Sequence, residues 1–259
     1  MTGASTSTTR RTLLSFRVIP RLDIKGANLI KGIQMEGLRV LGKPADFAER
    51  YAQEGADELL YIDTVASLYG RNHLENILAE TAERVFIPIT VGGGIRSVGD
   101  IRLLLNSGAD KVGINTFGIQ NPDFISRAAS SFGSQAVCVH IDAKRVNGHW
   151  EAYTDCGREP SGKDAIEWAH EAEALGAGEI LLTSVDRDGS QAGADLELGR
   201  LMQGLGIPVV FGGGIGHPRH AVEAAGMADG IAVGAALHYG KTTIRELKSA
   251  LAVAGVEVR

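Results

Sequence analysis

The amino-acid sequence predicts an α/β fold in which eight parallel strands close into a (β/α)8 barrel. Two observations lead to this prediction: eight short apolar runs alternate with amphipathic segments, and the second half of the chain repeats the first. The 259 residues also suit one such barrel, which typically needs about 250. A doubly wound open sheet is the alternative, but the Gly-x-Gly-x-x-Gly turn that usually follows its first strand does not follow residue 24.

The eight apolar runs are the expected strands, because each is short and rich in Val and Ile, as buried parallel strands are. They cover residues 17–24, 58–63, 87–91, 111–115, 136–142, 179–184, 209–211 and 230–234. The clearest helices between them span 45–54, 97–107 and 163–175. Each of these three segments is followed by a glycine, which is typical of a helix C-terminus. This repeated alternation of strand and helix favours a parallel sheet.

Four segments of the first half recur in the second half in the same order. Residues 87–95 recur at 207–215, 55–59 at 176–180, 22–25 at 141–144 and 109–112 at 228–231. The offsets lie between 119 and 121 residues, which indicates two similar halves of four strand–helix units each. Two such halves, about 16–135 and 136–259, close most simply into one eightfold TIM barrel.

Residues 1–15 differ from the rest of the chain, since they hold eight Ser and Thr, two adjacent arginines and no acidic residue. We expect a flexible tail, followed by a single barrel domain over 16–259. A twin-arginine signal is the weaker interpretation, because Arg17, Arg21 and Asp23 interrupt the apolar segment that it would need. The barrel is therefore expected in the cytoplasm.

The composition argues against several classes of function. With 26 Lys and Arg against 31 Asp and Glu, the net charge of −5 argues against nucleic-acid binding. No apolar run approaches the roughly 18 residues of a membrane span. The two cysteines, Cys138 and Cys156, cannot form a disulfide framework and are expected as free thiols. Because no Cys or His spacing suggests zinc, we expect neither a metal nor another cofactor.

The active site is expected where the strands end, because barrel active sites lie at the carboxyl ends of their strands. The repeat places one carboxylate there in each half, Asp23 and Asp142. Two carboxylates that face each other across the barrel mouth suit paired proton transfer, so we predict a catalytic acid–base pair. A single aspartate would more simply cap its own loop, but the symmetric placement favours catalysis.

Two glycine turns also end strands, at 92–94 and 212–214. Successive backbone N–H groups in such a turn can hold an anion, and glycine allows a close approach. Two copies suggest two phosphate sites and a substrate with a phosphate at each end, although tight turning alone is the alternative. The expected phosphate-binding residues are Gly93, Gly94, Gly213 and Gly214, with Asn115 and Thr116 as further donors to the first site.

Further polar residues follow other strands. Segment 183–189 ends the sixth strand, and its Thr183, Asp188 and Gly189 suit a ribose or another polyol. Asp63 ends the second strand at the same mouth. Lys31 lies after the first strand, where it either reaches over the site on a mobile loop or remains solvated.

Charged residues begin four strands at the opposite, N-terminal face of the predicted barrel. They are Arg17, Glu58, Lys111 and Glu179. Such residues usually meet solvent, but four charges of balanced sign can instead close the bottom of the barrel as a salt-bridged ring.

Three segments, 132–137, 141–145 and 176–189, resemble the cyclase subunit of imidazole glycerol phosphate synthase, and the likeness extends over 17–259. The resemblance implies a glutaminase partner that docks on the N-terminal face and releases ammonia into the barrel. Ammonia would then attack a bisphosphorylated ribulosyl formimino nucleotide, giving imidazole glycerol phosphate and an aminoimidazole carboxamide ribotide. The resemblance also implies that Asp23 and Asp142 are the acid–base pair, that the four charges form an ammonia gate and that Lys31 sits on a closing loop.

Several residues depart from that family. A small residue is usual where Arg21 stands, and strand alternation would point Arg21 inward with Asp23. Serines of the second phosphate site are replaced by Cys156 and Ala235, and Gly212 stands where serine is common. Residues 36–42 and 67–72 resemble a paralogous group associated with the amidation of surface-polysaccharide sugars. The alternatives are therefore a sugar-amidating paralogue with the same ammonia channel, or a non-catalytic scaffold for a glutaminase.

Overall fold

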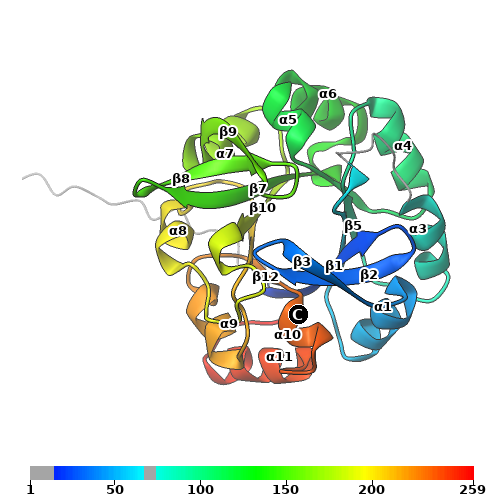
Figure 1. The fold of residues 1–259 in the computed structure, drawn as a ribbon, viewed down its shortest axis with the longest axis vertical. Coiled ribbons are helices and arrows are strands. Elements are labelled where there is room, and N and C mark those ends of the chain that lie inside the picture. Colours follow the sequence, from blue (N-terminus) through cyan, green and yellow to red (C-terminus); the bar gives the residue numbers. More distant parts are fainter. Residues whose placement is uncertain (1–14, 67–73) are drawn as a thin grey trace, which may run out of the picture.

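The computed structural model describes residues 15–66 and 74–259; the predicted tail up to residue 14 and segment 67–72 lie outside these described residues. Eight parallel strands pair in the order β10–β11–β12–β1–β4–β5–β6–β7, and β7 pairs with β10 to close the ring (Figure 1). They are β1 (Arg17–Lys25), β4 (Leu59–Asp63), β5 (Ile89–Gly92), β6 (Lys111–Ile114), β7 (Val137–Val146), β10 (Glu179–Ser184), β11 (Val209–Gly212) and β12 (Gly230–Val233). The predicted eight-stranded barrel is confirmed, and each predicted strand has its counterpart.

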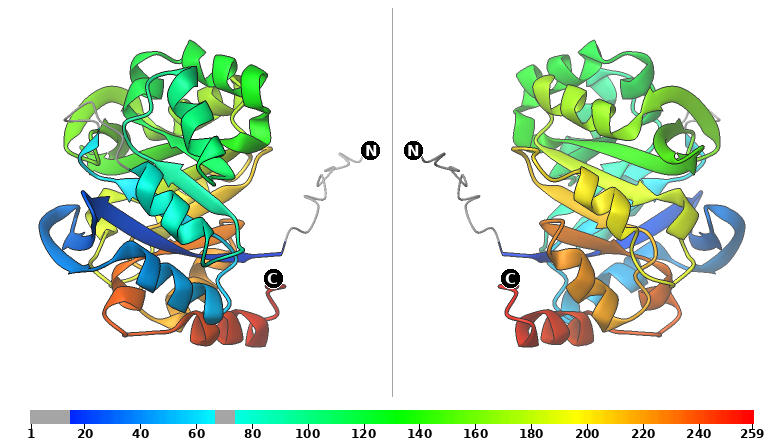
Figure 2. Two further views of the ribbon diagram at one scale, coloured as in Figure 1. Left: turned by 90° about the vertical axis from the view of Figure 1, so that its right-hand side faces the viewer. Right: turned by 90° about the vertical axis from the view of Figure 1, so that its left-hand side faces the viewer.

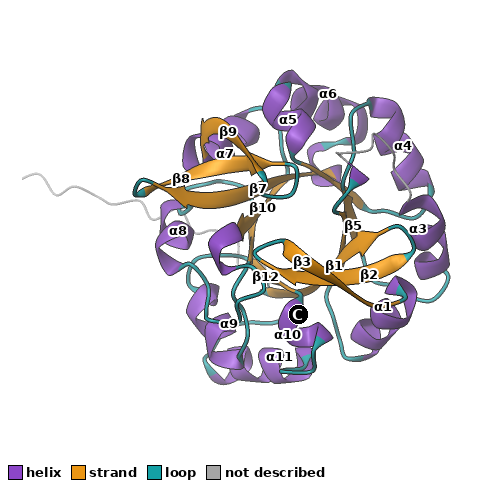
Figure 3. Cartoon of the chain, viewed as in Figure 1, coloured by secondary structure: helices purple, strands orange, loops and turns teal. Residues whose placement is uncertain are grey.

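Helices surround the ring of strands on its outside, as Figures 1 and 3 show. They are α1 (Pro44–Gln53), α3 (Leu74–Ala82), α4 (Val98–Asn106), α5 (Thr116–Gln120), α6 (Asp123–Phe132), α7 (Ala165–Ala174), α8 (Leu196–Leu201), α9 (Pro218–Ala225), α10 (Ala235–His238) and α11 (Ile244–Val253). Capping residues fix where several of these helices begin. Ser97 and Asp100 form a capping box at the N-terminus of α4, and the Asp164 side chain accepts backbone N–H groups at the N-terminus of α7. In the described part of the chain, none of these helices has the length and apolar character needed to cross a membrane.

Two antiparallel hairpins extend the sheet beyond the barrel, and the sequence analysis did not predict them. Strands β2 (Asn28–Ile33) and β3 (Glu36–Gly42) follow β1, while β8 (His149–Thr154) and β9 (Glu159–Asp164) follow β7. Each hairpin thus extends the first strand of one half, in keeping with the repeat. Asn147 and Gly148, both at positive φ, form the tight turn before β8, which is a recognisable hairpin signal. Figure 2 shows the blue β2–β3 hairpin at one end of the barrel and the C-terminus at the other.

Two apolar layers pack against the strands of the barrel. The larger lies between strands and helices and includes the fully buried Leu22 and Ile141. The smaller lies inside the barrel and consists of Ile19, Leu60, Ile62, Cys138, Leu181, Val210 and Ala232. Because successive residues of a strand point to opposite faces, Arg21 and His140 enter the interior with this smaller layer, and both are buried.

Candidate active site

The two predicted acid–base carboxylates lie at the carboxyl ends of β1 and β7, and both are buried. Asp23 accepts hydrogen bonds from Arg21 Nε and Lys31 Nζ, each at 2.8 Å. Asp142 instead accepts one from the neutral Asn115 Nδ2, at 2.9 Å. The sequence gives the two positions the same strand-end placement, but the fold gives them opposite electrostatic surroundings.

These surroundings separate the pKa values of the two carboxyl groups. Burial alone would raise the pKa of Asp23, but the charges of Arg21 and Lys31 outweigh burial and hold it well below its usual range. Burial raises the pKa of Asp142 to about 6, although Arg21 acts in the opposite direction. A pair whose environments move the pKa values apart is suited to separate roles as base and acid.

Lys31 is almost completely buried, with 2% of its surface exposed, so its alternative interpretation as a solvated side chain is wrong. From β2 its Nζ reaches 2.8 Å from Asp23 and 2.9 Å from Asp188. The hairpin that carries it rests on the loop after β10, because Gln34 N–H donates to the carbonyl of Asp188 at 2.8 Å. Gly189 is required at this contact, since a Cβ there would lie 2.5 Å from a backbone carbonyl oxygen.

Arg21 points into the barrel from β1, as strand alternation predicted, and is fully enclosed. Besides Asp23, its guanidinium donates to the Thr183 hydroxyl at 3.1 Å. Two cavities open at the mouth, of about 50 and 20 Å³, and Arg21 lines both of them. A substrate that occupies both cavities would therefore pass beside this cation.

Each glycine turn borders one of the two cavities. Gly93 and Gly94 line the first cavity with positive φ of 114° and 69°, and Gly213 and Gly214 line the second with 97° and 86°. Glycine is needed at both turns, because a Cβ on Gly93 or Gly214 would lie 2.5 or 2.0 Å from a backbone oxygen. Successive N–H groups of a tight turn can form a concave surface that binds anions.

The remaining predicted residues divide between the two cavities. Asp63, Asn115 and Thr116 line the first, and Asp188 and Gly189 line the second. Asp63 and Thr116 also hold loops: Asp63 accepts the N–H groups of Val65 and Ala66, and Thr116 accepts that of Asp155.

Cys156 lies in the first cavity with Asp142, so its assignment to the second phosphate site is wrong. The reason is the unpredicted hairpin: β8 pairs antiparallel with β7, and the turn after β8 brings Cys156 back toward the mouth. Burial raises the pKa of the Cys156 thiol to about 12, so this side chain is a neutral neighbour of Asp142.

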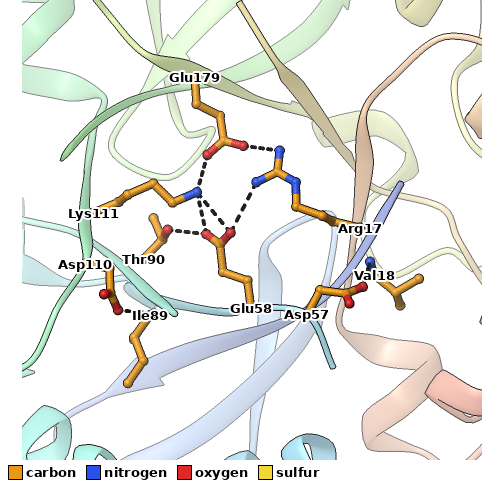
Figure 4. Close-up of polar contacts among 9 residues, drawn as sticks. All are labelled: Arg17, Val18, Asp57, Glu58, Ile89, Thr90, Asp110, Lys111 and Glu179. Carbon is orange, nitrogen blue, oxygen red and sulfur yellow. Dashed lines mark hydrogen bonds and ion pairs between the residues drawn. The ribbon is translucent and has the colours of Figure 1, made fainter. Parts of the chain in front are cut away.

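The four charged residues at the strand starts form a closed ring of ion pairs at the N-terminal face (Figure 4). Glu58 lies 3.2 Å from Arg17 and 2.8 Å from Lys111, and Glu179 pairs with the same two cations. Thr90 donates its hydroxyl to Glu58. Burial opposes the charge of Lys111, but Glu179 and Glu58 hold its pKa above the ordinary value. The barrel bottom is thus covered by charges held in place by one another.

His140 is a polar residue of the interior that the sequence analysis missed. It lies on β7 between Cys138 and Asp142, and it lines the first cavity. Burial, with the charges of Arg21 and Lys111, lowers the pKa of His140 to about 3. Strand alternation identifies it, because His140 lies two residues before Asp142 and therefore on the same face of β7. In residues 15–66 and 74–259, no three His, Cys, Asp or Glu side chains are grouped to hold a metal ion.

The fold and the mouth together define a class of protein. A closed eight-stranded parallel barrel with polar side chains gathered at the carboxyl ends of its strands is a (β/α)8-barrel enzyme. The chain belongs to the histidine biosynthesis protein family, whose model matches residues 17–243. It is similar to the imidazole glycerol phosphate synthase subunit HisF of Legionella pneumophila, with 59% identity over 202 residues that cover 77% of this chain and 95% of the relative.

Proposed function

We propose that this chain is the ammonia-using cyclase of histidine biosynthesis. It takes a bisphosphorylated ribulosyl formimino nucleotide and ammonia, and it releases imidazole glycerol phosphate and an aminoimidazole carboxamide ribotide. The 59% identity to a synthase subunit over most of both chains carries this proposal. The two buried carboxylates at the mouth, each on the first strand of a half-barrel, support it from the chemistry.

In this proposal Asp142 is the general acid and Asp23 the general base. Ammonia adds to the ketone carbon of the ribulosyl unit, a C–N bond forms, and the ketone oxygen leaves as water after it has gained protons. The new nitrogen then attacks the formimino carbon and closes the imidazole ring, and the bond from that carbon to the amine nitrogen of the carboxamide ribotide breaks, so the ribotide leaves with a proton on its amine. Asp142, with its pKa of about 6, can deliver a proton at near-neutral pH. Asp23 stays ionised beside Arg21 and Lys31 and accepts the proton that the attacking nitrogen loses.

The two glycine turns hold the two phosphates of this substrate. The turn at Gly93 and Gly94, with Asn115 and Thr116, takes one phosphate, and the turn at Gly213 and Gly214 takes the other. Thr183, Asp188, Gly189 and Asp63 contact the sugars between them. Lys31 and Arg21 add positive charge near a substrate that carries several negative charges.

A glutaminase is the proposed partner, and it docks on the N-terminal face. The ring of Arg17, Glu58, Lys111 and Glu179 then acts as the gate through which ammonia enters the barrel. These ion pairs are largely buried, and the cost of removing the charges from water offsets much of their attraction, so stability alone gives little reason for four interlocked charges at the strand starts. A gate gives a better reason, because ammonia must be kept from bulk water, where it becomes protonated.

The test measures conversion of the nucleotide by the purified chain with ammonium chloride. We expect Asp23→Asn and Asp142→Asn each to lower turnover by about 10²–10⁴-fold. Asp46→Asn is the matched control, because Asp46 lies exposed on α1 and lines neither cavity, and it should retain full activity.

The wild-type result decides between the proposed acceptors. Absence of conversion at any ammonia concentration would refute the cyclase. If the complex with a glutaminase nevertheless transferred ammonia to a polysaccharide sugar, the amidating paralogue would take its place. If the complex transferred ammonia to neither acceptor, a non-catalytic scaffold for a glutaminase would be the remaining interpretation.

A further inference from the structure

Strand β7 presents three inward residues in a row between the ring of charges and the mouth. Cys138 lies beside the ring, where the charge of Glu179 acts on its thiol. Asp142 lies at the mouth, and His140 lies between them. With a rise of about 3.3 Å per residue, His140 is about 7 Å from each of its two neighbours along the strand. The imidazole therefore stands midway on the path that ammonia would follow.

The barrel is shaped around this imidazole. A Cβ on Gly113 of β6 would lie 2.2 Å from His140 Nε2, and a Cβ on Gly92 of β5 would lie 2.8 Å from the Cε1 atom. Real Cβ atoms essentially never come this close to another heavy atom, so the ring would have to move. The glycines on two neighbouring strands thus leave room for the ring and fix its position.

His140 Nε2 is buried and has no hydrogen-bond partner among the described residues. Buried polar atoms are nearly always hydrogen-bonded, and an unpaired one needs an explanation such as a small bound molecule. His140 lines a cavity of about 50 Å³, and a water-sized molecule needs about 10–15 Å³. Because Nε2 itself is enclosed, a small rotation of the ring brings this atom into contact with a molecule in the cavity.

The imidazole is neutral near pH 7. Burial, Arg21 and Lys111 all lower the pKa of His140, to about 3. A neutral ring can exchange hydrogen bonds with ammonia, whereas an imidazolium would protonate it and remove its nucleophilic lone pair. The cations that lower this pKa, at the mouth and in the ring of charges, thus keep the site compatible with free ammonia.

We propose that the ring of His140 is a binding site for ammonia inside the barrel, between the ring of charges and the mouth. Ammonia hydrogen-bonded to Nε2 is held in its unprotonated form, about 7 Å from Asp142 along β7 on the side of the ring of charges. This inference rests on the proposed function and deepens it, because it names a positioning residue for the nucleophile. His140 does not take part in the proton transfers assigned to Asp23 and Asp142.

Two substitutions separate hydrogen bonding from packing. His140→Leu removes the hydrogen-bonding atoms, and His140→Gln keeps them. Leu181→Met serves as the packing control, because Leu181 is paired with His140 in the adjacent strand and belongs to the inner apolar layer. The kinetic parameters are measured with the nucleotide saturating and ammonia varied.

We expect His140→Leu to raise the KM for ammonia by roughly two- to tenfold, the loss of one hydrogen bond, with little change in kcat. His140→Gln and Leu181→Met should stay within about twofold of the wild type. Equal KM values in all four proteins, or equal losses in the leucine and glutamine variants, would show that His140 only packs. If His140→Leu lowered only kcat and left the KM for ammonia unchanged, the proposed ammonia site would also be refuted.

A binding measurement tests the site without any turnover. In a sample with ¹⁵N-labelled histidine, the His140 ring signals are assigned by their loss in His140→Gln. Added ammonium chloride at pH 9 should shift them saturably, and potassium chloride should not. If the wild type turns over normally but its signals do not move, water alone occupies the position and the inference fails. If the signals shift without turnover, the site stands and the proposed function fails.

Discussion

Asp142→Asn should make the protein more stable while it removes the activity. A carboxyl whose pKa is raised by folding binds its proton more tightly in the folded state, so its contribution to stability is lost as the pH rises through that pKa. The pKa of Asp142 changes from 3.8 to about 6 on folding. At pH 8 this corresponds to about 3 kcal/mol of lost stability, and at pH 5 to roughly half of that. The introduced amide does not ionise and can still accept the hydrogen bond from Asn115.

The assay is urea unfolding followed by circular dichroism, for the wild type and the variant at pH 5 and pH 8. The gain in the free energy of unfolding should be larger at pH 8 than at pH 5 by about 1 kcal/mol. This comparison removes any effect of the substitution that does not depend on pH. A gain of the same size at both pH values, or a loss at pH 8, would refute the assignment of Asp142 as the carboxyl with the raised pKa.

Asp23→Asn is the matched control and should have the opposite effect. Its carboxylate is paired with Arg21 and Lys31, and breaking a buried ion pair typically costs about 3–5 kcal/mol. Because the pKa of Asp23 is lowered, its stabilising contribution is fully present above the unfolded value of 3.8 and is lost only at lower pH. The loss should therefore be nearly equal at pH 5 and pH 8.

Three further substitutions test other parts of the structure. Lys111→Met opens the ring of charges, so glutamine-dependent turnover of the complex should fall at least about tenfold relative to turnover with added ammonia; equal losses with both nitrogen sources would mark the ring as a structural plug. Gly113→Ala places a Cβ 2.2 Å from the His140 ring and should lower the free energy of unfolding by about 1–3 kcal/mol, and an unchanged melting temperature would contradict this packing. Gly214→Ala places a Cβ 2.0 Å from the Gly193 carbonyl oxygen. Calorimetry with inorganic phosphate should therefore show weaker binding at the second turn only. In the unmodified protein, we expect the first turn to bind phosphate more firmly than the second.

The sequence by itself determined the barrel and its internal repeat. Strand identity depends on local apolar periodicity, and the offset of 119 to 121 residues makes the two halves equivalent without knowledge of any contact. Strand ends were also predictable, because parallel strands in register place their first residues on one face and their last on the other. That rule alone gathers Arg17, Glu58, Lys111 and Glu179 at the bottom and Asp23 and Asp142 at the top.

Only the tertiary structure decided what each of these residues contacts. Lys31 meets Asp188 across 157 residues of sequence, a pairing that depends on how the β2–β3 hairpin folds over the mouth. The hairpin also adds Lys31 to Arg21 as a second cation beside Asp23, whereas Asp142 lies beside the neutral amide of Asn115, although the repeat makes the two positions equivalent. Protonation states follow from distances of a few ångströms between distant segments, because electrostatic interactions and desolvation depend on position in space. Sequence periodicity reports which face of a strand a side chain occupies, and it carries no information about those distances.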